Sequence, residues 1–181
     1  MIRLLLRELL HSLAETEVRF CSNQSPLFFR KLFLRFMRVR YEPDLWIGPS
    51  FRLSRIGNLS LGHRCAIGAY SIIQNPGPIR IGDDFLASSR LTLAAGGHDP
   101  VTLEPQLSGI EIGHRVWCGV NVTIIDGVMI GDDVVIGAGS VVCNDIPSNS
   151  IAVGVPAKKI KDLKRAPDCK LWHWVRRGDE E

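Results

Sequence analysis

The stretch IIDGVMIGDDVVIGAGSVV, residues 124–142, returns an aliphatic side chain every six residues. An α-helix repeats its faces every 3.6 residues and a β-strand every two, so a period of six fits a short strand followed by a corner. Because six is even, the first and fifth residues of each hexad point to the same side of such a strand. Both positions are apolar or small between residues 112 and 147. The first positions are Ile112, Cys118, Ile124, Ile130, Ile136 and Val142, and the fifth positions are Val116, Val122, Val128, Val134, Ser140 and Ile146.

The remaining hexad positions hold the residues that corners require. Glycine recurs at the second position, and turn formers such as Asp132 and Asp133 take the third and fourth. An ordinary parallel sheet would need crossovers of a dozen or more residues between its strands, and none fit between residues 112 and 147. Stacked short strands with regular corners predict a solenoid instead, in which each coil covers the face of its neighbour.

The six-residue repeat continues upstream and is broken once. Before residue 98 the first hexad positions are again apolar and fall into sets of three. With three hexads to a coil, the repeat predicts about five coils in all. The sets are Leu61, Ile67 and Ile73, then Ile81, Ala87 and Leu93, with a weaker first set at Ile47, Leu53 and Leu59. Residues 99–111 carry two prolines and no hexad, so they should leave the coil as an excursion. Long excursions from a rigid scaffold are often functional, and His98 lies directly before this one.

Helical spacing, rather than a period of six, marks the two ends of the chain. Within residues 1–44 apolar side chains recur at intervals of three and four, which predicts an N-terminal α-helical segment over the first coil. Residues 162–181 contain KLWHWVRR, with Trp172 and Trp174, and predict a short C-terminal helix or a hook over the last coil. The expected fold is an all-β solenoid of residues 45–161 between two helical ends.

The charge of the chain is small but unevenly distributed. A formal net charge of +3 over 181 residues gives no reason to expect nucleic acid as a partner. Residues 1–40, however, hold eight Arg and Lys against three Glu, a net charge of +5. Together with Phe28, Phe29, Phe33 and Phe36, these cations predict an amphipathic surface that either contacts an anionic membrane or packs over the first coil.

The cysteines and the apolar runs indicate the compartment. Five cysteines at scattered positions form no CxxC pair, and an odd number of free thiols is typical of a reducing compartment. No stretch approaches the roughly 18 apolar residues of a membrane span. We therefore expect a cytoplasmic protein, either free or peripheral at the inner face of the membrane.

Three motifs of the chain occur together in one family. The repeat core is IEIGHRVWCGVNVTIIDGVMIGDDVVIGAGSVV, a loop carries GGHDP, and the segment after the repeats is DIPSNSIAVGVPAKKIK. Over residues 45–161 the chain resembles the hexapeptide-repeat acyltransferases, in particular their sugar and polysaccharide O-acetyltransferases. The resemblance implies a left-handed parallel β-helix and a homotrimer. It also implies acetyl-CoA bound between neighbouring subunits, with no metal.

His98 is the candidate catalytic residue. Transfer of an acyl group from a thioester to a sugar hydroxyl needs a base near neutral pH, and imidazole suits that role. The resemblance implies that His98 deprotonates the acceptor hydroxyl for direct attack on the thioester; the alternative is a histidine that only serves a turn. Asp99 either orients the ring beside the acceptor or begins the turn before Pro100. Cys118 takes an inward hexad position, which predicts a packed, inert thiol rather than a nucleophile.

For the CoA molecule the resemblance implies contacts of two kinds. Backbone groups around Ala138 and Gly139 would contact it, and Lys158 and Lys161 would meet its phosphates. The alternative for the two lysines is a solvated basic tail. Trp117 follows an inward residue and so faces outward beside the implied groove, where it packs against the pantetheine or against a neighbouring subunit.

Two positions depart from the family pattern. Many relatives have Thr-Lys where this chain has Cys143 and Asn144, which removes one cation from the implied CoA site. Arg90 takes the place of an asparagine near the acceptor in galactoside- and maltose-type relatives. An arginine there recognises a carboxylate or phosphate on an acidic sugar or a lipid-linked saccharide, or else it forms a structural salt bridge.

These features together predict an acetyl-CoA-dependent O-acetyltransferase for a sugar hydroxyl in the biosynthesis of capsule, O-antigen or exopolysaccharide. Three alternatives remain open. The acceptor can be a small molecule of the serine or antibiotic type. A carbonic-anhydrase-like hydratase on the same helix needs three histidines converging on zinc, for which His63, His98 and His114 are available. The third alternative is a non-catalytic trimeric scaffold.

Overall fold

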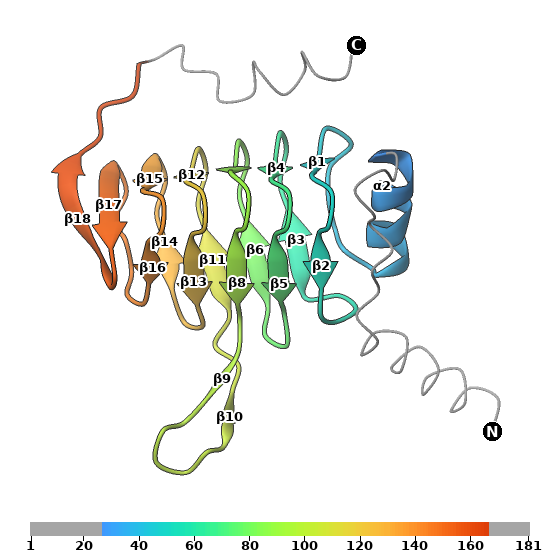
Figure 1. The fold of residues 1–181 in the computed structure, drawn as a ribbon, viewed down its shortest axis with the longest axis horizontal. Coiled ribbons are helices and arrows are strands. Elements are labelled where there is room, and N and C mark those ends of the chain that lie inside the picture. The colour runs from blue at the N-terminus through green and yellow to red at the C-terminus, as the bar shows by residue number, and fades with distance from the viewer. Residues whose placement is uncertain (1–26, 167–181) are drawn as a thin grey trace.

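The computed structural model describes residues 27–166, which form a stack of coils with helix α2 (Leu27–Phe36) at its N-terminal end (Figure 1). The strands are β1 (Trp46–Ile47), β2 (Arg52–Leu53), β3 (Leu59–Leu61), β4 (Ala66–Ile67), β5 (Ile72–Gln74), β6 (Ile79–Ile81), β7 (Leu86–Ala87), β8 (Thr92–Ala94), β9 (Gly97–His98), β10 (Pro105–Gln106), β11 (Ile110–Ile112), β12 (Trp117–Cys118), β13 (Thr123–Ile125), β14 (Met129–Ile130), β15 (Val134–Ile136), β16 (Val141–Val142), β17 (Ser150–Gly154) and β18 (Ala157–Asp162). Within the described residues, no helix combines the length and the hydrophobicity that crossing a bilayer requires.

Three sheets form the faces of the stack. The β1 face has the order β1-β4-β7-β12-β15-β17-β18, the β2 face β2-β5-β8-β13-β16, and the β3 face β3-β6-β11-β14. The chain visits the three faces in turn, and equivalent residues of successive coils pair in register, as Ile67 does with Ile47 and Ala87. The chain makes about five turns, so the number of coils predicted from the repeat is confirmed.

The interior of the coils is filled by the residues that the six-residue repeat selects. All twelve first- and fifth-position side chains from Ile112 to Ile146 are buried, and none is more than 4% exposed. Ser140, the polar member of the set, accepts a hydrogen bond on Oγ from the Gly154 amide at 3.1 Å. The predicted inward positions are therefore confirmed, and the interior polar atom has a partner.

Three kinds of corner connect the faces. The first corner joins the β1 face to the β2 face, the second joins the β2 face to the β3 face, and the third leads into the β1 face of the next coil. Residues with positive φ recur at the first corner (Ser50, Tyr70, Arg90, Asn121, Gly139) and at the third (Arg64, Asp84, Arg115, Asp133, Asn149). The coils pack closely at the corners. A Cβ atom added to Gly119 would lie only 2.6 Å from the Ala138 amide nitrogen, too close for a side chain.

An alternating ladder of charges runs along the third corner. From the first coil to the fifth, the corner holds Glu42 and Asp44, His63 and Arg64, Asp83 and Asp84, His114 and Arg115, and finally Asp132 and Asp133. Arg64 donates two hydrogen bonds to Asp84, at 2.6 and 2.7 Å. Arg115 donates two to Asp133, at 2.8 and 2.6 Å, and these bonds hold the pKa of Asp133 below its ordinary value. Arginine–carboxylate pairs thus link successive coils.

The excursion from the stack has different limits from those predicted. The chain leaves the coil after β8 and returns at β11, so the excursion spans residues 95–109 rather than 99–111. Ile110 is fully buried, and Glu111 pairs with Arg80 in the β3 face, so both already belong to the coil. The predicted limits were wrong because the hexads were counted from Ile112, whereas strand β11 begins two residues earlier. Ile110, Glu111 and Ile112 all pair with β6.

Additional elements lie at both ends of the stack. Leu34 of α2 is fully buried against the first coil, and the predicted N-terminal helical covering is present from residue 27. At the other end β17 continues the β1 face, and β18 returns antiparallel beside it. The predicted C-terminal helix with Trp172 and Trp174 lies outside the described residues, as does the N-terminal segment before residue 27.

Candidate active site

The excursion is an antiparallel hairpin that projects away from the coils (Figure 1). In it β9 pairs with β10, and His98 lies opposite Pro105. The His98 side chain is exposed, and no strand of the stack depends on it. The hairpin therefore presents an imidazole to solvent at a point where a substrate can reach it.

Asp99 holds the tip of the hairpin in shape. Its Oδ1 accepts hydrogen bonds from the amides of Val101 and Thr102, each at 2.8 Å, and its Oδ2 accepts one from Gln106 Nε2 at 3.2 Å. The amides of Thr102 and Val101 lower the pKa of Asp99. This is the geometry of an aspartate that begins a turn, the second of the two roles considered for it.

Asp126 fixes the point where the hairpin rejoins the stack. It lies at the second corner of the fourth coil, where its Oδ1 accepts the Gly109 amide at 2.7 Å and its Oδ2 the Ser108 amide at 2.9 Å. Gly109 has φ of 91°, and a Cβ there would lie 2.5 Å from the Pro78 carbonyl oxygen. The end of the hairpin is thus held between the second and fourth coils.

Sequence reasoning did not select Asp126. The available signal was an Asp-Gly pair (Asp126-Gly127) one coil after the excursion, because aspartate side chains commonly accept backbone amides at turns. The charge ladder was also missed, although its charges occupy equivalent hexad positions with alternating sign. Both features depend on which coils become neighbours, and the repeat does contain that information.

Three predicted binding residues lie along one edge, the line of first corners. Arg90 is the positive-φ residue of this corner in the third coil, and Gly139 takes the same place in the fifth. Ala138 precedes Gly139, and all three residues are exposed. The Gly139 amide donates to the Val120 carbonyl at 2.8 Å, which ties this corner to the coil before it. Two coil spacings, roughly 10 Å, separate Arg90 from Gly139 along the stack.

An outward-facing apolar row runs beside this edge on the β1 face. Its members pair in register from coil to coil: Trp46, Ala66, Leu86, Trp117, Val135 and Ile151. Trp117 is 41% exposed, so the prediction that it faces outward is confirmed. Ala66 and Leu86 are buried against Trp46, so the accessible part of the row next to Ala138 and Gly139 consists of Trp117, Val135 and Ile151.

Lys158 and Lys161 continue this row onto β18. Lys161 pairs with Ile151 and Lys158 with Val153, two residues that face outward on either side of the buried Ala152. A β-bulge lies between these pairs and brings both lysines to the same face. Lys159 forms an ion pair with Asp162 at 2.6 Å.

Within one chain the structure separates His98 from the first-corner edge. The hairpin leaves the stack at the second corner, whereas Arg90 and Gly139 lie at the other end of the β2 face. Ala95 lies five residue steps after Arg90 along extended chain, about 16 Å at 3.3 Å per step. Asn144 also lies at the second corner, after β16, and is exposed on the side of the hairpin.

The other two histidines weighed for a zinc site lie at the third corner. His63 Nδ1 is 3.7 Å from an Asp44 carboxylate oxygen, and His114 Nδ1 accepts the Asp83 amide at 3.0 Å. One chain therefore does not bring His63, His98 and His114 together. Among residues 27–166, no group of three or more His, Cys, Asp or Glu side chains is placed to hold a metal ion.

The thiol of Cys118 is part of the core. Its side chain is fully buried, and burial raises its pKa to about 12, so it remains protonated and unreactive at neutral pH. The prediction of a packed thiol is confirmed. Cys65 has the same environment, and burial raises its pKa to about 12 as well.

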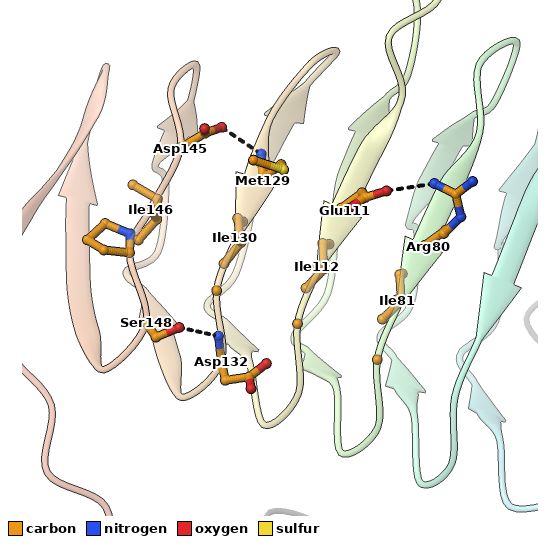
Figure 2. A pocket seen from close by; sticks show the side chains of 14 residues that line it. Arg80, Ile81, Glu111, Ile112, Met129, Ile130, Asp132, Asp145, Ile146 and Ser148 are labelled. Carbon is orange, nitrogen blue, oxygen red and sulfur yellow. Dashed lines mark hydrogen bonds and ion pairs between the residues drawn. The ribbon is translucent and has the colours of Figure 1, made fainter.

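A shallow groove crosses the outer side of the β3 face (Figure 2). Its volume is about 760 Å³, and its lining includes Arg80, Glu111, Met129 and Asp145. Arg80 and Glu111 form an exposed ion pair with each other at 2.6 Å, and Asp145 accepts the Met129 amide at 2.8 Å. None of the predicted site residues lines this groove, so we assign it no part in the chemistry.

Known proteins similar to the chain are acetyltransferases, although no family model matches it. Galactoside O-acetyltransferase of Escherichia coli (strain K12) is 34% identical over 148 residues, covering 78% of this chain and 72% of that protein. WbbJ of the same organism, provisionally named a lipopolysaccharide biosynthesis O-acetyl transferase, is 35% identical over 150 residues, covering 74% and 76%. A hexapeptide-repeat-containing acetyltransferase from Vibrio cholerae O1 biovar eltor, solved with acetyl coenzyme A, has a TM-score of 0.75 at 26% identity, covering 87% and 89%.

A stack of six-residue repeats, as in these neighbours, is the fold of the left-handed β-helix acetyltransferases. The similarity to two acetyltransferases, at 34% and 35% identity, extends over about three quarters of the chain. The chain belongs to the hexapeptide-repeat acetyltransferase family, and its coils form a left-handed parallel β-helix.

Proposed function

We propose that the protein transfers an acetyl group from acetyl-CoA to a sugar hydroxyl during the biosynthesis of a surface polysaccharide. The observation that carries the proposal is the GGHDP hairpin, which holds an exposed imidazole outside an otherwise regular stack. The relatives named for galactoside and lipopolysaccharide support the acceptor class, and the acetyl coenzyme A complex of the Vibrio protein supports the donor. The free thiols of Cys65, Cys118 and Cys143 support a cytoplasmic location.

In the proposed reaction His98 is the general base. Its neutral ring takes the proton of the acceptor hydroxyl while the hydroxyl oxygen attacks the thioester carbonyl carbon. The C–O bond forms, the C–S bond breaks, and the proton passes from His98 to the sulfur of the leaving CoA. The protonated, buried thiol of Cys118 favours this direct transfer over a route through an acyl-enzyme.

We propose that acetyl-CoA lies along the first-corner edge. Ala138 and Gly139 would contact it through their backbone, and Trp117 would pack against the pantetheine. The exposed Lys158 and Lys161 at the end of the apolar row suit the phosphates, since ammonium groups are mobile point charges. Asn144 lies on the hairpin side, so its contribution would come from a neighbouring subunit.

A site shared between subunits accounts for the separation of His98 from the first-corner edge. In a closed ring of three chains with parallel axes, the second corner of one chain can face the first corner of the next. We therefore expect a homotrimer, and light scattering should give a mass three times the 20.1 kDa of the chain. A monomer at assay concentration would contradict both the homotrimer and the shared site.

Replacing Lys158 or Lys161 with alanine is expected to raise the apparent KM for acetyl-CoA about tenfold, with little change in kcat. The reason is that each lysine contributes a charged contact that is the same before and during the reaction. Initial rates of thiol release at varied acetyl-CoA measure the effect. Lys159→Ala is the matched control, because that side chain is paired with Asp162. An unchanged KM in both variants would assign Lys158 and Lys161 to a solvated tail.

The proposed acceptor carries a carboxylate or a phosphate, as acidic and lipid-linked saccharides do. Arg90 is exposed at the first-corner edge, where its guanidinium can form a bidentate contact with such a group, and Asp99 lies next to the base. The test is a screen of neutral, acidic and lipid-linked saccharides, serine and antibiotics with acetyl-CoA, monitored by released thiol. If thiol is released only with serine or only with an antibiotic, the acceptor is that small molecule and not a sugar. A protein that does not bind acetyl-CoA would be a scaffold.

A further inference from the structure

Helix α2 has a second apolar surface, on the side opposite the coil. Leu34 faces the first coil and is fully buried. Away from it, Phe28, Phe29, Leu32 and Phe36 are 69%, 56%, 52% and 57% exposed. We call these four side chains the α2 stripe. Successive residues of an α-helix are about 100° apart around the axis, so the four side chains lie within about 100° of its circumference. Large apolar side chains gathered on one surface helix indicate an interaction site.

The chain around the α2 stripe is basic and contains no compensating acid. Residues 27–41 hold five cations and no Asp or Glu: Arg30, Lys31, Arg35, Arg38 and Arg40. Arg30 and Lys31 donate to the carbonyl oxygens of Ile47 and Pro43, each at 2.7 Å, and so fasten the helix to the first coil. Arg35, Arg38 and Arg40 are exposed. Glu42 follows this segment, and its carboxylate lies 3.7 Å from His63 Nε2.

We propose that the α2 stripe and its flanking arginines dock the protein on an anionic phospholipid bilayer. The helix lies in the plane of the interface, with its phenylalanines at the boundary of headgroups and acyl chains. The arginines meet the anionic headgroups, to which their charge is complementary. A groove of about 720 Å³ adjoins the stripe. Its lining includes Phe28 and Leu32 of the stripe, three cations (Lys31, Arg35, Arg40) and one acid, Glu42, so it offers an anionic headgroup a net positive surface.

The position of α2 gives the docking a defined orientation. Because α2 lies at the N-terminal end of the stack (Figure 1), the stack stands on the membrane with β17 and β18 at its far end. In a homotrimer with parallel axes, three α2 helices lie at the same end and bind together. Access to lipid-linked saccharides would follow from this orientation and rests on the proposed function, whereas docking itself does not.

The test is co-flotation of the full-length protein with vesicles. We expect binding to mixed phosphatidylglycerol and phosphatidylcholine vesicles, release at high salt, and no binding to phosphatidylcholine alone. The triple variant Phe28→Ser/Leu32→Ser/Phe36→Ser and the charge variant Arg35→Glu/Arg38→Glu should each weaken binding by about tenfold or more. Met129→Ser removes a 55% exposed apolar side chain from the β3 face, and this control should bind like the unaltered protein.

Equal binding to neutral vesicles, or unchanged binding in both variants, would overturn the proposal. A lower melting temperature of the serine variant would also overturn it, because the stripe would then be covered by residues 1–26 rather than by lipid. A changed mass of the serine variant in light scattering would overturn it as well, because the stripe would then contact a second copy of the chain. Thiol release with a water-soluble saccharide should be unchanged in all variants, so a failure of docking and a failure of acetyl transfer are distinguishable.

Discussion

Replacement of His98 by alanine is expected to lower kcat for acetyl transfer by roughly 10²- to 10⁴-fold, the usual contribution of a general base. The variant should still fold, assemble and bind acetyl-CoA, because His98 is exposed in a hairpin outside the stack. Thiol release at saturating acceptor measures kcat, and calorimetric titration measures acetyl-CoA binding.

His63→Ala and His114→Ala are the matched controls for this experiment. Both histidines lie in the third-corner ladder, and their replacement should change kcat far less than that of His98. The assignment of His98 as the base is wrong if His98→Ala retains more than about a tenth of the unaltered kcat. Loss of activity together with loss of the assembled form would point to a structural role instead.

Asp126→Ala is expected to lower kcat by about ten- to a hundredfold, because small displacements of a catalytic group have effects of this size. The replacement leaves the amides of Ser108 and Gly109 without their acceptor and releases the end of the hairpin that carries His98. The KM for acetyl-CoA should stay the same, since the first-corner edge is untouched. Steady-state kinetics with both substrates varied separates the two constants.

Two further variants distinguish positioning of His98 from a general loss of stability. Asp126→Asn keeps one carbonyl acceptor and should restore part of kcat. Asp145→Ala removes an aspartate from the second corner of the next coil, where Oδ1 accepts the Met129 amide at 2.8 Å and no hairpin is attached. If Asp145→Ala lowers kcat as much as Asp126→Ala does, the positioning role of Asp126 is refuted.

The architecture could be predicted because the repeat encodes it directly. Two apolar positions per six residues fix which side chains enter the coil, and the buried set from Ile112 to Ile146 follows that rule without exception. The same rule identified Cys118 as core and Trp117 as outward-facing. It did not locate the return of the hairpin, because Ile110 lies ahead of the first complete hexad.

The geometry of the candidate site was less accessible to sequence reasoning. Strict alternation along a strand would put Lys158 and Lys161, three residues apart, on opposite faces, and only the bulge in β18 brings them to one face. The bonds of Asp126 connect residues 17 and 18 positions apart, so predicting them requires that the hexads first be stacked into coils by their repeat and that neighbouring corners then be compared. The distance between His98 and Gly139 likewise depends on which corner the hairpin leaves.

The charge ladder at the third corner restricts how a solenoid of this kind can change in length. Removing the third coil alone would bring the basic corner of Arg64 against the basic corner of Arg115 and would delete Asp84, the partner of Arg64. Removing two adjacent coils instead would leave opposite charges facing each other throughout. The ion pairs therefore favour two kinds of coil in alternation, and insertions or deletions of an even number of coils are expected to keep these pairs.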